Sequence, residues 1–147
     1  MLPLTLPPFD YQVKKSAGKL WIFDIIRRRY FVLTPEEWVR QHVVHFLIGH
    51  RGYPPALVAV EREISVCGLR RRFDIVCFDR SAAPYLVVEC KAPSVELSAA
   101  VFDQAFRYNL TLQARYVAIT NGIVHHSVPL TADGPGRPFS DFPSFAP

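Results

Sequence analysis

Three charged residues interrupt stretches of sequence that are otherwise typical of buried strands. Asp74 lies in an apolar run, and Glu89 and Lys91 follow the apolar run from Tyr85 to Val88. An ionised group inside a sheet is costly unless it is paired or binds a metal. Because side chains alternate along a strand, Glu89 and Lys91 should face one side of the sheet while Cys90 faces the other, and a neighbouring strand can present Asp74 beside them.

Two carboxylates and one ammonium group at a single point indicate phosphate chemistry. Carboxylate oxygens suit Mg²⁺ or Mn²⁺, which bind through one or two carboxylates together with substrate phosphate and water. Such an ion would polarise a phosphoryl oxygen and lower the pKa of a bound water, while Lys91 positions that water or stabilises charge in the transition state. The plainer alternative is an ion pair of Lys91 with a carboxylate, or charges that reach solvent at a strand end, and it usually explains a lone Glu-x-Lys.

The elements that must position these residues follow from periodicity and capping signals. Thr34 can cap a helix that begins at Pro35, and the apolar spacing continues it to about residue 49. Strands are predicted at 57–66, 72–78 and 84–90, arranged as a meander. The second and third are apolar on both faces, which predicts central strands that are covered by helices on each side.

The flanking segments complete an α/β fold. A second helix is predicted at 97–112, followed by strands at 116–120 and 123–128 around an Asn121-Gly122 turn. A short hairpin is expected near the N-terminus, around the turn signal at residues 16–19. The proline-rich segment 129–147 should lack regular structure and dock as an extended strap. We therefore expect one domain over residues 1–128 and a tail over 129–147.

The bulk composition fits a single domain. The chain has 147 residues, of which 50% are hydrophobic and 20% charged, so it can offset the conformational entropy lost on folding. Its net charge of +4 favours a polyanionic partner. The three cysteines lie in or beside apolar runs, which argues against a disulfide framework and favours the cytoplasm. No segment reaches the roughly 18 apolar residues of a membrane span, so no membrane partner is expected.

The spacing of the charged residues resembles a known motif. Asp74, fifteen residues before Glu89-Cys90-Lys91, is similar to the Asp and Glu-x-Lys of the PD-(D/E)XK nuclease superfamily. The Gln104 to Tyr108 segment resembles the Gln-x-x-x-Tyr motif of type I restriction endonuclease R subunits, and its spacing puts both residues on one helix face. Residues 8–128 resemble the N-terminal domain of those R subunits in a small stand-alone form. One departure is Phe73, which stands where the superfamily motif has proline.

The resemblance implies a restriction-endonuclease-like fold with an αβββαβ core, a mixed central sheet flanked by helices, and here an N-terminal hairpin. It also implies a metal site in which Mg²⁺ or Mn²⁺ is bound by Asp74, Glu89 and the backbone carbonyl of Cys90. Lys91 would give catalytic support.

Three further residues are candidates for the site. The resemblance implies that Gln104 and Tyr108 orient the substrate or the site. A first-helix carboxylate often joins such sites, and Glu37 is preferred to Glu36, although its place in a capping box offers a purely structural explanation.

The arginines at 70, 71 and 72 precede Asp74, where a nucleic-acid backbone would have to pass. Ordinary solvated charge explains them equally well. The leading interpretation is a metal-dependent nuclease that acts on nucleic acid, with DNA favoured. The alternative is a catalytically silent module of the nuclease fold that binds nucleic acid or serves in assembly. A homodimer formed through the phenylalanine-bearing tail stays open.

Overall fold

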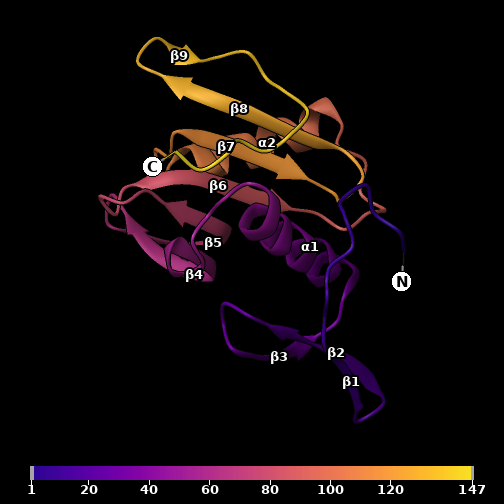
Figure 1. Cartoon of the computed structure of the whole chain (residues 1–147). Coiled ribbons are helices and arrows are strands. Elements are labelled where there is room, and N and C mark those ends of the chain that lie inside the picture. The colour runs from indigo at the N-terminus through magenta and orange to yellow at the C-terminus, as the bar shows by residue number, and fades with distance from the viewer. Residues whose placement is uncertain (1, 147) are drawn as a thin grey trace.

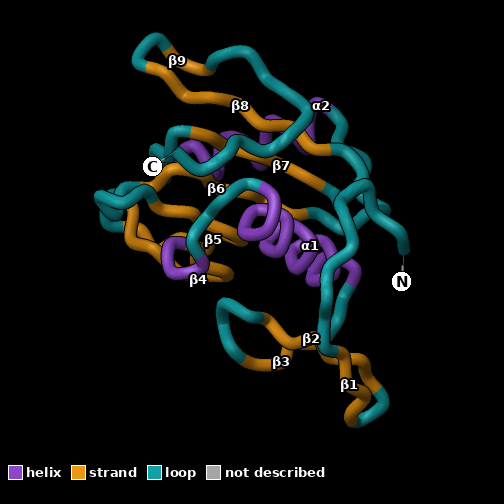
Figure 2. The backbone as a smooth tube through the Cα atoms, in the orientation of Figure 1, coloured by secondary structure: helices purple, strands orange, loops and turns teal. Residues whose placement is uncertain are grey.

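The main body is a six-stranded mixed sheet with one helix on each face (Figures 1 and 2). The computed structural model describes residues 2–146. The strand order follows the sequence: β4 (Val58–Val66), β5 (Leu69–Phe78), β6 (Pro84–Cys90), β7 (Tyr116–Thr120), β8 (His125–Thr131) and β9 (Gly134–Pro135). Neighbours are antiparallel except β6 and β7, which are parallel and are joined by α2 (Ala99–Leu110). The predicted α/β core is confirmed.

Both faces of the sheet are buried, as its apolar central strands predict. Helix α1 (Pro35–His50) packs on one face through Val39, Val43 and Leu47, and α2 covers the other face through Ala105 and its neighbours. From Ile75 to Cys77, successive residues of β5 alternate between these two cores, with Ile75 on the α1 side and Val76 on the α2 side. A short 3-10 turn (Pro55–Leu57) leads from α1 into β4.

Helix α1 begins where the sequence indicates, but with half of the expected capping box. Thr34 Oγ1 accepts a hydrogen bond from the Glu37 backbone N–H at 3.0 Å. The Glu37 carboxylate does not return to Thr34, because it pairs with Arg27 and Arg40 instead. The first turn of α1 is therefore tied to an ion-pair network as well as to its cap.

The N-terminal unit has three strands where a two-stranded hairpin was expected. Strands β1 (Val13–Ser16), β2 (Lys19–Asp24) and β3 (Arg29–Val32) form a separate antiparallel sheet that stands beside α1, apart from the main sheet (Figure 1). The third strand, β3, consists of Arg29 and the apolar residues that follow it. Gln41 of α1 donates to the buried Asp24 carboxylate at 2.9 Å, which ties this sheet to the body.

Two hairpin loops differ from the predicted bounds for local reasons. Strand β5 begins three residues earlier than expected, because Cys67 and Gly68 both have positive φ and make a tight two-residue turn. The loop between β7 and β8 is longer than expected. Asn121 Oδ1 accepts from the backbone N–H groups of Ile123 and Val124, and this side-chain turn delays β8 until His125.

The proline-rich segment has more regular structure than predicted. Strand β8 continues through Thr131 and pairs with β9, because prolines are tolerated where the ladder needs no donor. Beyond residue 136 the chain is an extended strap, as expected (Figure 2). Phe142 is only 3% exposed in the α1-side core, and Tyr53 Oη donates to the Pro143 carbonyl at 2.8 Å. No helix within residues 2–146 is long and apolar enough to cross a membrane.

We predict that Phe142→Ala lowers the free energy of unfolding by about 3 kcal/mol, the usual cost of removing a buried phenylalanine. Urea denaturation of wild type and variant measures the difference. Leu69→Ala, at a side chain that is 58% exposed, is the matched control and should change stability by less than about 0.5 kcal/mol. Equal effects of the two substitutions would show that the strap is not part of the core.

Candidate functional site

The candidate site lies at a break in the sheet. The β4–β5 ladder runs from Val58 to Val60 and resumes at Arg62, so Glu61 and Asp74 stand opposite each other outside the regular pairing. Glu61 has φ of 53°, in the left-handed region that non-glycine residues rarely adopt. Such strained positions concentrate at functional sites.

The break also exchanges the two faces of β4. Val58 and Val60 contribute to the core under α1, whereas Ile64 and Val66, beyond the break, pack on the α2 side. Glu61 lies where β4 changes faces, and its side chain belongs to neither core. Glu61 is therefore directed into a cleft at the end of the sheet.

This cleft has a volume of about 630 Å³ and is bounded by the start of α1, the break, the end of β6 and one face of α2. Its charged and polar lining residues are Glu36, Glu61, Arg72, Asp74, Glu89, Lys91, Gln104 and Tyr108. Five residues predicted for catalysis therefore line one cavity: Asp74, Glu89, Lys91, Gln104 and Tyr108.

The end of β6 has the alternation that the sequence implies. Lys91 Nζ lies 3.2 Å from Glu89 Oε2 on the cleft side, while Cys90 is buried in the α1-side core. Burial, followed by the charge of Asp74, raises the pKa of the Cys90 thiol well above its usual value, so it stays protonated. The side chain of Cys90 therefore belongs to the core, and only its backbone takes part in the site.

Asp74 is held at the same strand end by two donors. Its Oδ2 accepts from the Cys90 backbone N–H at 2.7 Å, and its Oδ1 lies 3.2 Å from Arg40 Nη2. The last β5–β6 pair is Ile75 with Val88. Asp74 and Glu89 lie next to this pair, one on each strand. The metal role of the Cys90 carbonyl stays a prediction.

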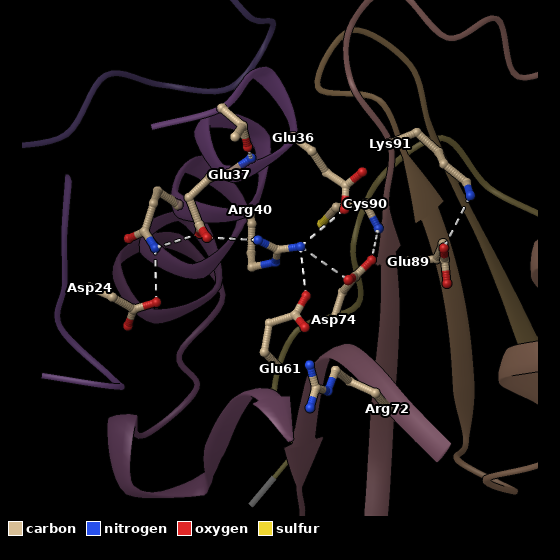
Figure 3. Close-up of polar contacts among 12 residues, drawn as sticks. Asp24, Glu36, Glu37, Arg40, Glu61, Arg72, Asp74, Glu89, Cys90 and Lys91 are labelled. Atoms are coloured by element: carbon tan, nitrogen blue, oxygen red, sulfur yellow. Dashed lines mark hydrogen bonds and ion pairs between the residues drawn. The ribbon is translucent and has the colours of Figure 1, made fainter. Parts of the chain in front are cut away.

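Arg40, from α1, is the centre of the acidic cluster (Figure 3). Its Nη2 lies 2.7 Å from Glu61, 3.1 Å from Glu36 and 3.2 Å from Asp74. Its Nη1 lies 2.8 Å from Glu37. Burial by itself lowers the pKa of Arg40, but the charges of Glu37 and Asp74 outweigh it and raise the pKa. The side chain is thus a permanent cation.

Glu37, the first-helix carboxylate that the sequence favours for the site, lies outside the cleft. Glu37 does not line the cleft: it faces the N-terminal sheet, where Arg27 Nη2 lies 2.9 and 3.0 Å from its two oxygens. Gln41 also donates to it at 3.1 Å. Glu36 is the carboxylate of α1 that reaches the cleft. Neighbouring residues are about 100° apart around a helix. Glu37 is directed towards Arg27, and Glu36 is therefore the one that is directed towards the cleft.

Tyr108 and Gln104 lie on the same face of α2, as their spacing predicts. The Tyr108 hydroxyl donates to the Arg72 carbonyl at 3.0 Å and accepts from the Arg72 N–H at 3.2 Å. It thus binds both backbone groups of β5 where β6 no longer pairs with it. Gln104 is exposed at the cleft.

The three arginines before Asp74 lie within β5 and differ in their surroundings. Arg72 lines the cleft and its side chain is 63% exposed. Arg71 stacks on the Tyr108 ring, with 4.9 Å from its guanidinium carbon to the ring centroid. Arg70 is 83% exposed and pairs with Glu63 on β4. Only Arg71 and Arg72 are therefore close to the cleft.

Asn109 is a site residue that the sequence analysis did not find. Its Nδ2 donates to Glu89 Oε1 at 2.8 Å and to the Ala105 carbonyl at 2.7 Å. The side chain is completely buried, and its Oδ1 accepts no hydrogen bond from any residue that the structure describes. Asn109 and Lys91 together fix the orientation of the Glu89 carboxylate.

The charges in the cleft are only partly balanced. Burial, assisted by a hydrogen bond with Asp74, raises the pKa of Glu61 from 4.5 to about 7. Burial and the charge of Asp74 also raise the pKa of Glu36. Both pKa shifts come first from burial and next from Asp74, and a further cation in the cleft would oppose them.

The donor chemistry fits a hard divalent cation. Four carboxylates line the cleft, and Mg²⁺ and Mn²⁺ prefer such oxygen ligands. Within residues 2–146, however, no group of three or more histidine, cysteine, aspartate or glutamate side chains is arranged to hold a metal ion. In Figure 3 the guanidinium of Arg40 lies between the carboxylates of Glu61, Glu36 and Asp74 and contacts all three.

Fold and cleft together define a mixed α/β domain with an acidic site at a break in its central sheet. A comparison with protein families gives this class a narrower identity: residues 35–143 match the type I restriction enzyme R protein N terminus. The match covers most of the chain, which therefore belongs to this family. The predicted relationship to the R subunits is confirmed, and the match extends into the C-terminal strap. No curated protein matches the chain.

We predict that Glu61→Gln changes how stability depends on pH when chelator is present. The folded protein holds the Glu61 proton up to about pH 7, whereas the unfolded chain releases it near 4.5. Between these values the folded state binds more protons, so wild type loses stability as pH rises through this window.

Urea denaturation at pH 5, 6, 7 and 8 measures this effect, because the variant cannot lose that proton. The stability of wild type relative to Glu61→Gln should fall from pH 5 to about pH 7 and level off towards pH 8. Glu63→Gln, on the exposed part of the same strand, controls for the loss of a carboxylate. A difference in stability between wild type and Glu61→Gln that is constant from pH 5 to pH 8 would contradict the raised pKa of Glu61.

Proposed function

We propose that the chain is a Mg²⁺- or Mn²⁺-dependent nuclease of the PD-(D/E)XK type that hydrolyses phosphodiester bonds in nucleic acid, with DNA favoured. The observation that carries this proposal is the convergence of Asp74, Glu89 and Lys91 on one cleft. The restriction-enzyme family supports a nuclease-related module. We also propose that the protein is located in the cytoplasm.

Asp74 and Glu89 would hold the metal ion, with Glu36 and Glu61 as further oxygen donors. A bound divalent ion supplies Lewis acidity toward a phosphoryl oxygen and toward a water molecule. Lys91 Nζ, with a side chain 33% exposed beside Glu89, would donate a hydrogen bond to the phosphoryl group and stabilise the charge that develops there.

Other residues of the chain would position the reacting groups. Asn109 orients Glu89 through its amide, and Tyr108 fixes the backbone two residues before Asp74. Gln104, exposed at the cleft, would contact the substrate. Arg71 and Arg72 would contact phosphates of the nucleic-acid backbone as it enters the cleft.

We predict that Asp74→Ala and Lys91→Ala each reduce cleavage of plasmid or single-stranded DNA by roughly 100-fold or more, the usual effect of removing a group that stabilises the transition state. EDTA should abolish cleavage and Mn²⁺ should restore it. Asp133→Asn, which removes an exposed carboxylate in the β8–β9 turn, should cleave as wild type does. Equal cleavage by wild type and both cleft variants would reject the proposed enzyme.

The competing function is a silent module that binds nucleic acid without cleaving it. It predicts DNA binding with no turnover under any metal. Calorimetric titration with Mn²⁺ distinguishes the two functions, because a simple Lys91–Glu89 ion pair should bind no divalent ion. Binding of Mn²⁺ that disappears in Asp74→Ala supports the nuclease.

We predict that Arg72→Gln weakens DNA binding and reduces its salt dependence by about one unit of the slope of log K against log salt concentration, as expected for one lost phosphate contact. Fluorescence anisotropy with labelled DNA, measured in EDTA at several salt concentrations, tests this. Arg137→Gln, in the exposed strap, removes one positive charge far from β5 and should leave the slope unchanged. Equal slopes for both variants would place the nucleic acid elsewhere.

A further inference from the structure

The contacts of Arg40 are unusual for an arginine with a purely structural role. Three carboxylates, those of Glu61, Glu36 and Asp74, lie 2.7 to 3.2 Å from one nitrogen, Nη2, which carries only two hydrogens. Meanwhile Nε, which is buried, finds no hydrogen-bond partner in the described part of the chain. An arginine that binds carboxylates for stability normally uses its planar fork in a bidentate manner. Arg40 instead acts as a concentrated positive charge where the carboxylates converge.

Arg40 contacts carboxylates that a metal ion in the cleft would also use, Asp74 among them. Arg40 is 6% exposed and enters from α1, while its partners come from α1, β4 and β5. The oxygens it contacts are those that would bind a hard cation. A guanidinium and a divalent ion that bind the same carboxylates repel each other, so the presence of one weakens the binding of the other.

We propose that Arg40 is the resident counter-cation of the cleft: it holds Glu36, Glu61 and Asp74 together before a divalent ion binds, and its Nη2 leaves them when Mg²⁺ or Mn²⁺ arrives. This inference rests on the proposed metal-dependent function. Arg40 is a positioning residue for the metal ligands.

Glu37 gives the displaced guanidinium a second attachment. Arg40 Nη1 lies 2.8 Å from Glu37, which is itself fixed by Arg27 at 2.9 Å and by Gln41 at 3.1 Å. Release of Nη2 from the cleft therefore leaves Nη1 bound to a carboxylate outside it. A small rotation of one side chain exchanges one cation for another, and the fold does not have to open.

Competition has a definite sign. Removal of the arginine should make the carboxylates repel one another and lower the melting temperature in chelator. It should also remove the competitor for the metal, so divalent ions bind more tightly and restore the lost stability. A structural arginine would give the opposite result, because its loss would disorder the ligands and weaken metal binding.

The test compares Arg40→Gln with Arg27→Gln by Mn²⁺ calorimetry and by melting curves with and without Mn²⁺. Arg27 is the matched control, since it also pairs with Glu37 but contacts no carboxylate that lines the cleft. We expect Arg40→Gln to bind Mn²⁺ at least tenfold more tightly than wild type and to regain its melting temperature when Mn²⁺ is saturating. Arg27→Gln should stay within about twofold of wild-type affinity. A folded Arg40→Gln protein with equal or weaker Mn²⁺ binding overturns the proposal.

A second measurement uses the wild-type chain and does not depend on the folding of a variant. Nuclear magnetic resonance follows the Arg40 guanidinium N–H signals and the carboxyl signals of Asp74 and Glu89 during titration with Mg²⁺. We expect the Arg40 protons to exchange faster with water over the same Mg²⁺ range that shifts the carboxyl signals. Carboxyl shifts with an unchanged Arg40 overturn this inference alone. If no carboxyl signal responds, the metal-dependent function fails together with it.

Discussion

The balance of charge at the break between β4 and β5 constrains the rest of this structure. Glu61 and Asp74 are brought together by the interrupted ladder, and an uncompensated pair of partly buried carboxylates is strongly unfavourable. Arg40 compensates them, which requires α1 to lie across this end of the sheet with its first turn directed at the cleft. The strand break, the place of α1 and the chemistry of the site are therefore coupled through one cluster of charges.

The N-terminal sheet belongs to the same network, although it does not line the cleft. Asp24 accepts from Arg27, Arg27 pairs with Glu37, and Glu37 pairs with Arg40. This series of ion pairs joins β2 to the cleft through the first turn of α1. Arg27 therefore anchors the small sheet to the first turn of α1 through Glu37, without contacting a carboxylate that lines the cleft.

The sequence predicts those parts of the site that local patterns determine. Asp74, Glu89 and Lys91 could be found because charge is unusual in apolar strands, and α1 and α2 because of their periodicity. Glu61 could not be found in this way, since its place depends on pairing with β5 and on a single residue with positive φ. Likewise, the choice between Glu36 and Glu37 depends on Arg27, a contact ten residues away in sequence that periodicity does not show.

Phe73 shows how a departure from a motif can be compensated by packing. Proline would fix φ at the position before Asp74 by its own ring. Phe73 is fixed from outside instead: it is 1% exposed in the α2-side core, with its ring centroid 5.7 Å from that of Tyr108. The hydroxyl of the same tyrosine binds both backbone groups of Arg72. The backbone on the N-terminal side of Asp74 is thus immobilised at two consecutive residues by one side chain of α2, which gives Tyr108 a structural reason to accompany Phe73 that is separate from any contact with substrate.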